Sequence, residues 1–206
     1  MTETTSTGNR SLFSAATLHE AAGRVGALPA RLRPAYAGAT FSGPARPVVC
    51  PQGDNLWLHR GVYAAQPGEV LVVATTGEEE YGYWGEILSV AAASRGLGGL
   101  VLDGGVRDTE VLGQVGFPVF AATTCMRGTI KDPEAGGGFP ERVTIGGITI
   151  AKGDMVVGDA DGVVALPKAR VDEVLKASRE REDKEASMMA ALRAGASTIE
   201  LMGLTP

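Results

Sequence analysis

Three short apolar segments alternate with two helical stretches between residues 69 and 121, and this alternation constrains the fold more than any other feature. The apolar segments are residues 69–74, 99–102 and 117–121, and the helical stretches are residues 85–95 and 109–114. Such apolar segments are typical of buried strands, and Gly96 is placed to end the first helix. Strands joined through helices pair in parallel with right-handed crossovers. The sequence therefore predicts an α/β protein with a parallel sheet.

The segments before this unit give weaker signals. Residues 1–10 are polar and Thr-rich, so we interpret them as a flexible tail ahead of a single domain of residues 11–206. Apolar spacing predicts helices over residues 11–26 and 54–65, whereas several prolines and glycines predict loop and short extended pieces over residues 28–51.

A glycine-rich loop at residues 135–139 separates the parallel unit from a different pattern. Residues 142–151 alternate around a Gly-Gly pair, which predicts a β-hairpin. Two more strands are predicted at residues 155–157 and 163–165, on either side of a turn. Residues 168–193 form one long charged helix with too few large apolar residues to be fully buried. We expect this helix to pack partly on another subunit.

Composition excludes several functional classes. The chain of 206 residues has 44% hydrophobic and 21% charged residues, which suits one globular domain. The net charge is -5 and the cations are not clustered, so a nucleic-acid partner is not expected. No run of about 18 apolar residues and no signal-peptide pattern occurs, so a membrane partner is not expected either. The two cysteines, Cys50 and Cys125, are isolated, which argues against a disulfide and favours the cytoplasm.

The predicted turn at residues 103–108 combines the groups that a ligand site needs. Its sequence, Asp-Gly-Gly-Val-Arg-Asp, follows a predicted parallel strand, where α/β proteins bind ligands. Arg107 offers a planar fork suited to a carboxylate, and Asp108 offers a hard oxygen ligand for Mg²⁺ or Mn²⁺. Together they suit a 2-oxo acid substrate. The plainer alternative is a surface ion pair in which Asp108 also caps a helix.

Several motifs follow one another in an order that is typical of one family. The motifs are Gly53-Asp54-Asn55 with His59, Gly85-Glu86-Ile87-Leu88, Arg95-Gly96, Asp103-Gly104-Gly105-Val106-Arg107-Asp108, Arg127-Gly128-Thr129 with Lys131-Asp132-Pro133, and residues 153–164. In these motifs the chain resembles the RraA-like family, which includes the 4-hydroxy-4-methyl-2-oxoglutarate and 4-carboxy-4-hydroxy-2-oxoadipate aldolases. The resemblance implies an αββα sandwich with a central parallel βαβ unit, late β-hairpins and a long C-terminal helix.

The resemblance also implies a reaction. Aldolases of this family are class II enzymes, which use a divalent cation to cleave a 4-hydroxy-2-oxo acid to pyruvate. Oxaloacetate decarboxylation is implied too, because both reactions pass through a pyruvate enolate. By the resemblance, Asp108 is the metal ligand, and Arg107 binds the substrate and stabilises the enolate charge. The pyruvate carboxylate would be held by the backbone amides of Gly85, Glu86, Ile87 and Leu88.

Two acidic positions are further candidates by resemblance. Glu86 matches a position that is usually Asp in the family, and it would assist proton transfer or hold metal-bound water. The alternative is a solvated glutamate in the first helical turn. A second acid comes, in this family, from the C-terminal helix of a neighbouring subunit and acts through water. Glu185 is the candidate and Glu182 the alternative, although a charged helix is usually a solvated face. A homo-oligomer, trimer or hexamer, is therefore expected.

The predicted helix of residues 54–65 supplies two candidate substrate-binding residues. Asn55 and His59 are one turn apart, so they share a helix face. Their alternative roles are a helix cap for Asn55 and a structural hydrogen bond for His59. Lys131 is a candidate to close the site electrostatically.

Two other functions compete with the aldolase. RraA itself shares the family fold but inhibits an RNA-processing nuclease by protein binding, and its branch is typically shorter and lacks the Asp after the Arg. Asp108 and the long C-terminal helix favour the enzyme. The other alternative is a lyase or isomerase with a different substrate. A metal and Arg107 would bind only the pyruvyl end, so these residues do not specify the rest of the substrate.

Overall fold

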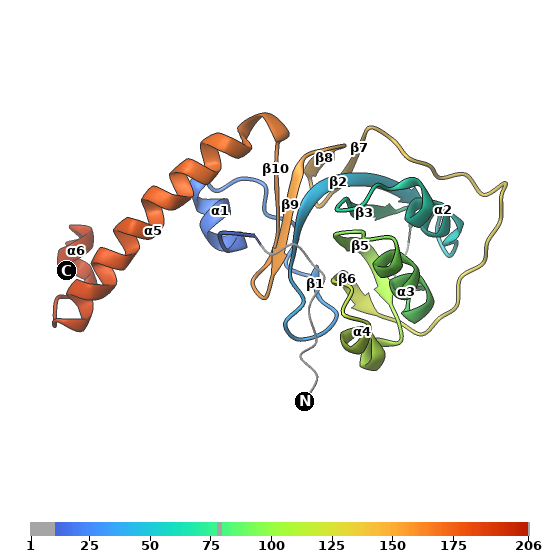
Figure 1. Ribbon diagram of the computed structural model, residues 1–206, viewed down its shortest axis with the longest axis horizontal. Coiled ribbons are helices and arrows are strands. Elements are labelled where there is room, and N and C mark those ends of the chain that lie inside the picture. The colour runs from blue at the N-terminus through green and yellow to red at the C-terminus, as the bar shows by residue number, and fades with distance from the viewer. Residues whose placement is uncertain (1–10, 78–79, 206) are drawn as a thin grey trace.

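The computed structural model describes residues 11–77 and 80–205, so the predicted tail of residues 1–10 lies outside the described residues. The described chain forms an eight-stranded sheet, a separate two-stranded hairpin, and helices packed outside the sheet (Figure 1). Within these ranges no helix combines the length and apolar character needed to cross a membrane.

Four parallel strands form the centre of the sheet and confirm the predicted α/β architecture. The strands of the sheet are β1 (Arg33–Pro34), β2 (Phe41–Cys50), β3 (Val70–Thr75), β4 (Gly82–Trp84), β5 (Gly99–Val106), β6 (Val119–Thr124), β9 (Met155–Asp159) and β10 (Gly162–Leu166). The parallel strands lie in the order β6, β5, β3, β2. β1 pairs antiparallel with β6, and β9 and β10 extend the opposite edge beyond β2. The short β4 pairs with the end of β5.

Three helices cover the outer face of the parallel strands, as Figure 1 shows. They are α2 (Leu56–Ala64), α3 (Glu86–Ser94) and α4 (Thr109–Val115). Leu58, Leu88 and Leu112, one from each helix, pack against the outward-facing Val73 and Leu102. Because the parallel strands are buried on both faces, their sequences are continuously apolar rather than alternating, which is why they could be predicted.

The inner face of the sheet encloses a second core. Phe41 and Phe120 meet edge to face, with ring centroids 5.1 Å apart, next to Val72 and Val101. The predicted hairpin, β7 (Arg142–Ile145) and β8 (Ile148–Ala151), adds its apolar side chains to this core. The sheet bends until its edges approach: Arg33 on β1 donates to the carbonyl of Asp161, beyond β9, at 2.9 Å. The sheet is therefore nearly barrel-like.

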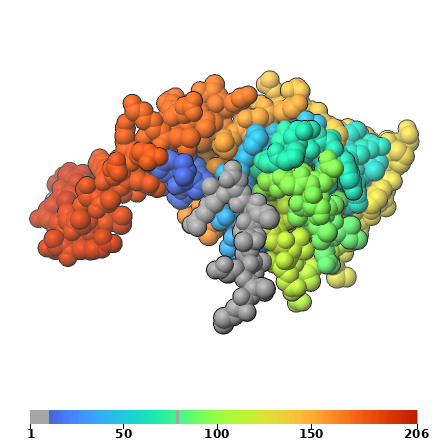
Figure 2. Space-filling model, viewed as in Figure 1, coloured from blue at the N-terminus to red at the C-terminus, as the bar shows by residue number. Residues whose placement is uncertain are grey.

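The C-terminal segment forms an arm that extends away from the sheet (Figures 1 and 2). It comprises η1 (Lys168–Arg170), α5 (Val171–Arg193) and α6 (Thr198–Met202). Near its start α5 packs on α1 (Ala15–Ala21), where Val174 and Ser178 are buried. The long C-terminal helix was predicted, whereas α6 was not. A capping box between Ser197 and Glu200 starts α6.

The prediction of mostly loop over residues 28–51 was wrong, because β2 is ten residues long. Its prolines are accommodated by a change of partner. Residues 41–44 pair with β9 and residues 45–50 pair with β3, so Pro44 lies where one pairing gives way to the other. At Pro47 the strand pairs with β3 alone, and the missing N–H therefore breaks no second ladder.

Candidate functional site

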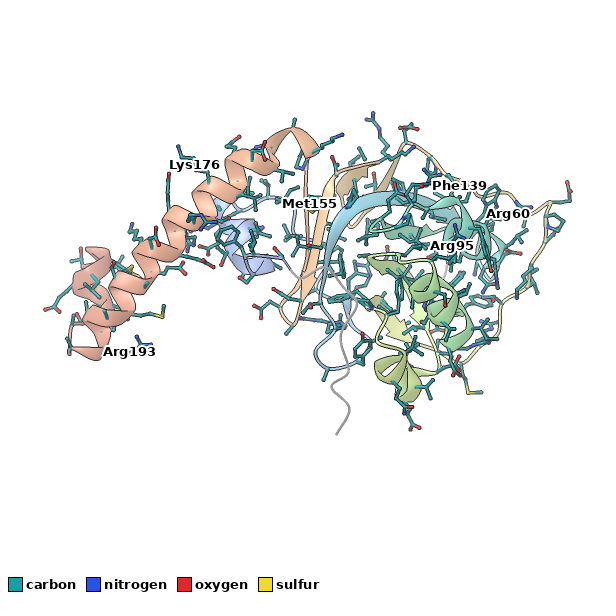
Figure 3. All side chains as sticks on the ribbon, viewed as in Figure 1. Arg60, Arg95, Phe139, Met155, Lys176 and Arg193 are labelled. Atoms are coloured by element: carbon teal, nitrogen blue, oxygen red, sulfur yellow. The ribbon has the colours of Figure 1, made fainter. Side chains whose placement is uncertain are left out.

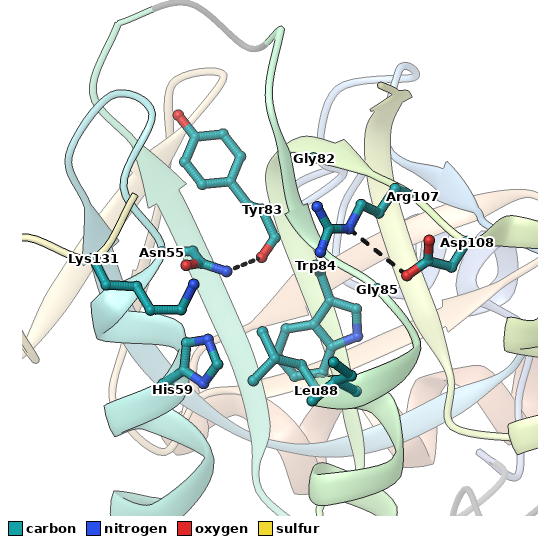
Figure 4. Close-up of a pocket in the computed structure, with 11 residues that line it drawn as sticks. Asn55, His59, Gly82, Tyr83, Trp84, Gly85, Leu88, Arg107, Asp108 and Lys131 are labelled. Atoms are coloured by element: carbon teal, nitrogen blue, oxygen red, sulfur yellow. Dashed lines mark hydrogen bonds and ion pairs between the residues drawn. The ribbon is translucent and has the colours of Figure 1, made fainter. Parts of the chain in front are cut away.

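A cavity of about 160 Å³ lies where α2, the start of α3 and the residues after β5 meet (Figure 4). At about 30 Å³ per water molecule, its volume suits a small metabolite. Most of the predicted site residues line it. The lining residues are Asn55, His59, Gly82, Tyr83, Trp84, Gly85, Ile87, Leu88, Arg107, Asp108 and Lys131.

Arg107 and Asp108 enter this cavity, but the first part of the predicted turn does not. β5 continues to Val106, so residues 103–106 are strand rather than turn. Asp103 forms a bidentate ion pair with Arg31, with oxygen–nitrogen distances of 2.8 and 3.0 Å. The chemistry expected over residues 103–108 is therefore confined to the last two. The Arg107 amide donates to the carbonyl of Trp84 at 2.9 Å, which joins the end of β5 to the segment before α3.

Asp108 adopts a left-handed backbone conformation, with φ 58° and ψ 31°. Few residues other than glycine adopt this region, and strain of this kind is concentrated at functional sites. The plainer alternative is half right: the exposed ion pair with Arg107 is present, but the Asp108 side chain makes no hydrogen bond that caps α4. Instead Oδ2 accepts a hydrogen bond of 3.1 Å from the amide of Glu86, at the start of α3. The Arg107 Nε lies 3.7 Å from the same oxygen, and both side chains are more than 40% exposed.

Glycines at two positions beside this pair leave space that a Cβ would fill. A Cβ on Gly85 would lie 2.2 Å from Asp108 Oδ2 and 3.1 Å from Arg107 Cγ. A Cβ on Gly82 would lie 2.4 Å from the carbonyl oxygen of Cys125 and 3.2 Å from Arg107 Cδ. The two glycines thus let β4 and the start of α3 approach the functional side chains closely.

The start of α3 lines the cavity through Gly85, Ile87 and Leu88. Gly85 is the N-cap residue, and the first intrahelical bond runs from the Ser89 amide to the Gly85 carbonyl at 3.1 Å. Amides in the first turn of a helix have no acceptor within the helix and carry partial positive charge. The amides of Ile87 and Leu88 are therefore suited to an anion such as a carboxylate. The indole of Trp84 donates to Ser89 Oγ at 2.7 Å and fixes this turn.

The opposite wall of the cavity is formed by α2 and the loop that carries Lys131 (Figure 4). Asn55 is the N-cap residue of α2 but makes no side-chain cap. Its Nδ2 donates to the carbonyl of Tyr83 at 2.8 Å. Burial and, to a smaller extent, the ammonium of Lys131 lower the pKa of His59 below its usual value of 6.5. His59 is therefore neutral at pH 7 and can accept a proton.

Asp54 was quoted from the sequence only as part of the Gly53-Asp54-Asn55 motif and was given no role, yet it stabilises this wall of the cavity. It is 1% exposed, and its carboxylate accepts hydrogen bonds from the amides of Leu56 and Asp132. The backbone N–H of Asn55 donates to the carbonyl of Ile130 at 3.1 Å in the same region. The loop bearing Lys131 is thereby fastened to the start of α2. The one available signal was the position of an acid directly before a helix, which is common at helix starts.

Glu86 lies outside the cavity lining. It is the first residue of α3, and its side chain is exposed, as the solvated alternative requires. Its contribution to the site as observed is its backbone amide, which binds Asp108. A catalytic role for its carboxylate stays a prediction.

Glu182 and Glu185 lie on α5, away from the cavity of their own chain. Glu185 pairs with Arg181 at 2.7 Å, one helical turn earlier. Figure 3 labels Lys176 and Arg193 on α5 at the left of the view, and Arg60, on α2, at the right. A role for either glutamate therefore requires a second subunit, as the resemblance implied.

The donor set at Asp108 fits a hard divalent cation. Residues 11–77 and 80–205 contain no cluster of three or more His, Cys, Asp or Glu side chains that would hold a metal alone. Asp108 offers one carboxylate, and its Oδ2 is already oriented by the Glu86 amide. Mg²⁺ often binds through one or two carboxylates and takes water and substrate oxygens as its remaining ligands. The ligand set of such a cation is completed only by water and substrate. The exposed carboxylate of Asp108 leaves room for both.

Comparisons with known proteins agree with this picture. The family model RraA-like, described as Aldolase/RraA, matches residues 14–165. A relative from Halalkalibacterium halodurans, named "Putative 4-hydroxy-4-methyl-2-oxoglutarate aldolase", is 34% identical over 160 residues, which are 77% of this chain and 75% of the relative.

Two solved structures show the same fold. An uncharacterized protein from Pseudomonas syringae pv. tomato superimposes with a TM-score of 0.79 at 25% identity, covering 93% of this chain and 89% of that one. The RNA-processing inhibitor RraA from Thermus thermophilis has a TM-score of 0.68 at 26% identity, covering 75% of this chain and 93% of that one. The extent of the family match and the shared fold show that this chain belongs to the RraA-like family.

Proposed function

We propose that the protein is a divalent-metal-dependent lyase that cleaves a 4-hydroxy-2-oxo acid to pyruvate by a retro-aldol reaction. The observation that carries the proposal is the meeting of three features in one cavity: the Arg107 guanidinium, the Asp108 carboxylate and the amides at the start of α3. A 2-oxo acid has a carboxylate beside a ketone, and these features match both groups. The name of the Halalkalibacterium halodurans relative supports the same reaction.

The chain's own groups have distinct roles in the proposal. The amides of Ile87 and Leu88 bind the carboxylate of the pyruvyl end. Arg107 faces the keto oxygen and stabilises the negative charge that develops there as the carbon–carbon bond breaks. Its backbone is held by the hydrogen bond to the Trp84 carbonyl, and its side chain lies beside the Asp108 carboxylate. Oxaloacetate would be decarboxylated at the same site, because it forms the same enolate.

Asp108 is the proposed ligand of Mg²⁺ or Mn²⁺. When bound, the cation would act as a Lewis acid that draws electron density from the keto acid. Glu185 of a neighbouring subunit, with Glu182 as the alternative, would reach the site through water in a trimer or hexamer. The cleavage also transfers the proton of the C4 hydroxyl to a base, and the carboxylate of Glu86, whose own backbone amide binds Asp108, is the proposed aid to this transfer.

The test is pyruvate release by the pure protein. We expect turnover of 4-hydroxy-4-methyl-2-oxoglutarate and of oxaloacetate with Mg²⁺, and its loss with EDTA. Asp108→Ala should abolish the metal-dependent rate. Glu110→Gln, which neutralises an exposed acid in the first turn of α4, is the matched control and should retain it. Full metal-dependent turnover by Asp108→Ala would reject the assignment of the site.

The second candidate is a non-catalytic regulator of ribonuclease activity. The observation that favours it is the structural similarity to the RNA-processing inhibitor RraA. The two functions differ in what the cavity must do: a regulator needs neither Asp108 nor a cation. Absence of any metal-dependent turnover, combined with inhibition of a ribonuclease by the pure protein, would replace the lyase with this function.

A further inference from the structure

The side-chain oxygen of Asn55 is buried without a hydrogen-bond partner. Asn55 is 6% exposed and lines the cavity, and none of the described residues donates to its Oδ1. An unsatisfied buried carbonyl loses its hydrogen bonds to water without replacement, and such groups in native proteins are uncommon. An acceptor of this kind at the wall of a cavity indicates that a donor is supplied by the ligand.

The orientation of the Asn55 side-chain amide is fixed by its nitrogen, Nδ2. Nδ2 donates to the carbonyl of Tyr83 at 2.8 Å. Flipping the amide would place Oδ1 against that carbonyl, and two acceptors cannot form a hydrogen bond. The oxygen therefore faces away from Tyr83, toward the side of the cavity where Lys131 and His59 lie (Figure 4).

We propose that Asn55 Oδ1 accepts a hydrogen bond from the C4 hydroxyl of the substrate, and that Asn55 thereby selects 4-hydroxy-2-oxo acids over keto acids without this group. The proposal rests on the proposed lyase function. At neutral pH the carboxylates and the ketone of such a substrate are acceptors, so the hydroxyl is the one donor that it can offer to Asn55.

The arrangement of the cavity supports this assignment. Arg107, Asp108 and the start of α3 form one wall, and α2 forms the opposite wall. With the pyruvyl end on the first wall, the rest of the substrate extends toward Asn55 and His59. A site that hydrogen-bonds a substrate hydroxyl discriminates strongly against analogues that lack it, because its own polar group is then left unpaired.

Two reactions of the same protein provide the test. Retro-aldol cleavage requires a substrate with the hydroxyl, whereas oxaloacetate has none, and both release pyruvate in the presence of Mg²⁺. We expect Asn55→Leu to lower kcat/KM for 4-hydroxy-4-methyl-2-oxoglutarate relative to oxaloacetate by roughly three- to tenfold, the scale of one lost hydrogen bond. Because a reduced folded fraction lowers both rates equally, this ratio reports on the hydroxyl.

Asn55→Asp is the matched control. It keeps an acceptor oxygen but loses the donor to Tyr83, so both rates should fall while the ratio stays within about twofold of the wild-type value. If Asn55→Leu does not fold, Asn55→Ala, which also lacks an acceptor, replaces it with the same expected fall in the ratio. An unchanged ratio in Asn55→Leu or Asn55→Ala would overturn the assignment. No metal-dependent turnover of either compound by the wild-type protein would reject the lyase itself, and the assignment with it.

Discussion

Gly85→Ala is a direct test of how closely the start of α3 must approach the functional pair. The added Cβ would lie 2.2 Å from Asp108 Oδ2, whereas ordinary contacts begin at 3.4 Å. With φ at -161°, the backbone accepts alanine, so the effect is a steric one on the carboxylate. Asp108 must move by about 1 Å, and it then loses its hydrogen bond to the Glu86 amide.

Two magnitudes follow from this displacement. A hydrogen bond to a charged group contributes about 1.5–3 kcal/mol, and with Asp108 partly exposed we expect a loss of about 1 kcal/mol in the free energy of unfolding. Misplacement of a reacting group by about 1 Å costs on the order of 100-fold in rate. Gly85→Ala should therefore be folded but nearly inactive.

The assay combines thermal unfolding with Mg²⁺-dependent pyruvate release. Gly113→Ala is the control, because its Cβ would meet Tyr36 at an ordinary 3.5 Å in the middle of α4. It should retain the wild-type rate and be equally or more stable, since alanine favours helix. Wild-type turnover by Gly85→Ala would show that the position of Asp108 does not control the reaction.

Three further predictions concern other parts of the site. Arg107→Ala should cost about 3–4 kcal/mol of transition-state stabilisation, as the loss of an oxyanion donor does, and kcat/KM for pyruvate release measures it. Asp54→Ala should leave two amides unpaired and lower the free energy of unfolding by roughly 1–3 kcal/mol in urea titrations; an unchanged midpoint would contradict its structural role. Because the folded-state pKa of His59 lies below 6.5, the unfolded chain binds its proton first, and stability should fall as the pH drops below about 6.5. His59→Gln should make unfolding less sensitive to pH between 7 and 5, and an unchanged sensitivity would exclude His59 as a cause.

The parts of the fold that were predicted are those in which local pattern and burial agree. β3, β5 and β6 are buried on both faces, so each is a continuous apolar run. β2 was missed because its prolines indicate loop, and their tolerance depends on which strand lies beside each one. That arrangement is tertiary and leaves no mark in the local sequence. β4 and α6 have only three and five residues, too few for a periodic signal.

The placement of the candidate site residues could be predicted only in part. The rule that ligands bind beyond the ends of parallel strands led to Arg107 and Asp108, which line the cavity. The sequence also suggested that Asp103 lies in the same turn. Asp103 is in fact within β5, because pairing with β4 and β6 extends that strand to Val106. The close contact between Gly85 and Asp108 joins residues of different elements, so no spacing in the sequence indicates it.

The proposed function depends on Asp108 and Arg107 binding a cation and a 2-oxo acid together. A crystal structure of the protein with Mn²⁺ and pyruvate would show whether they do. We expect an anomalous peak at Asp108, the pyruvate carboxylate on the amides of Ile87 and Leu88, and the keto oxygen facing Arg107. Mn²⁺ and pyruvate bound elsewhere, with this cavity empty, would contradict the account.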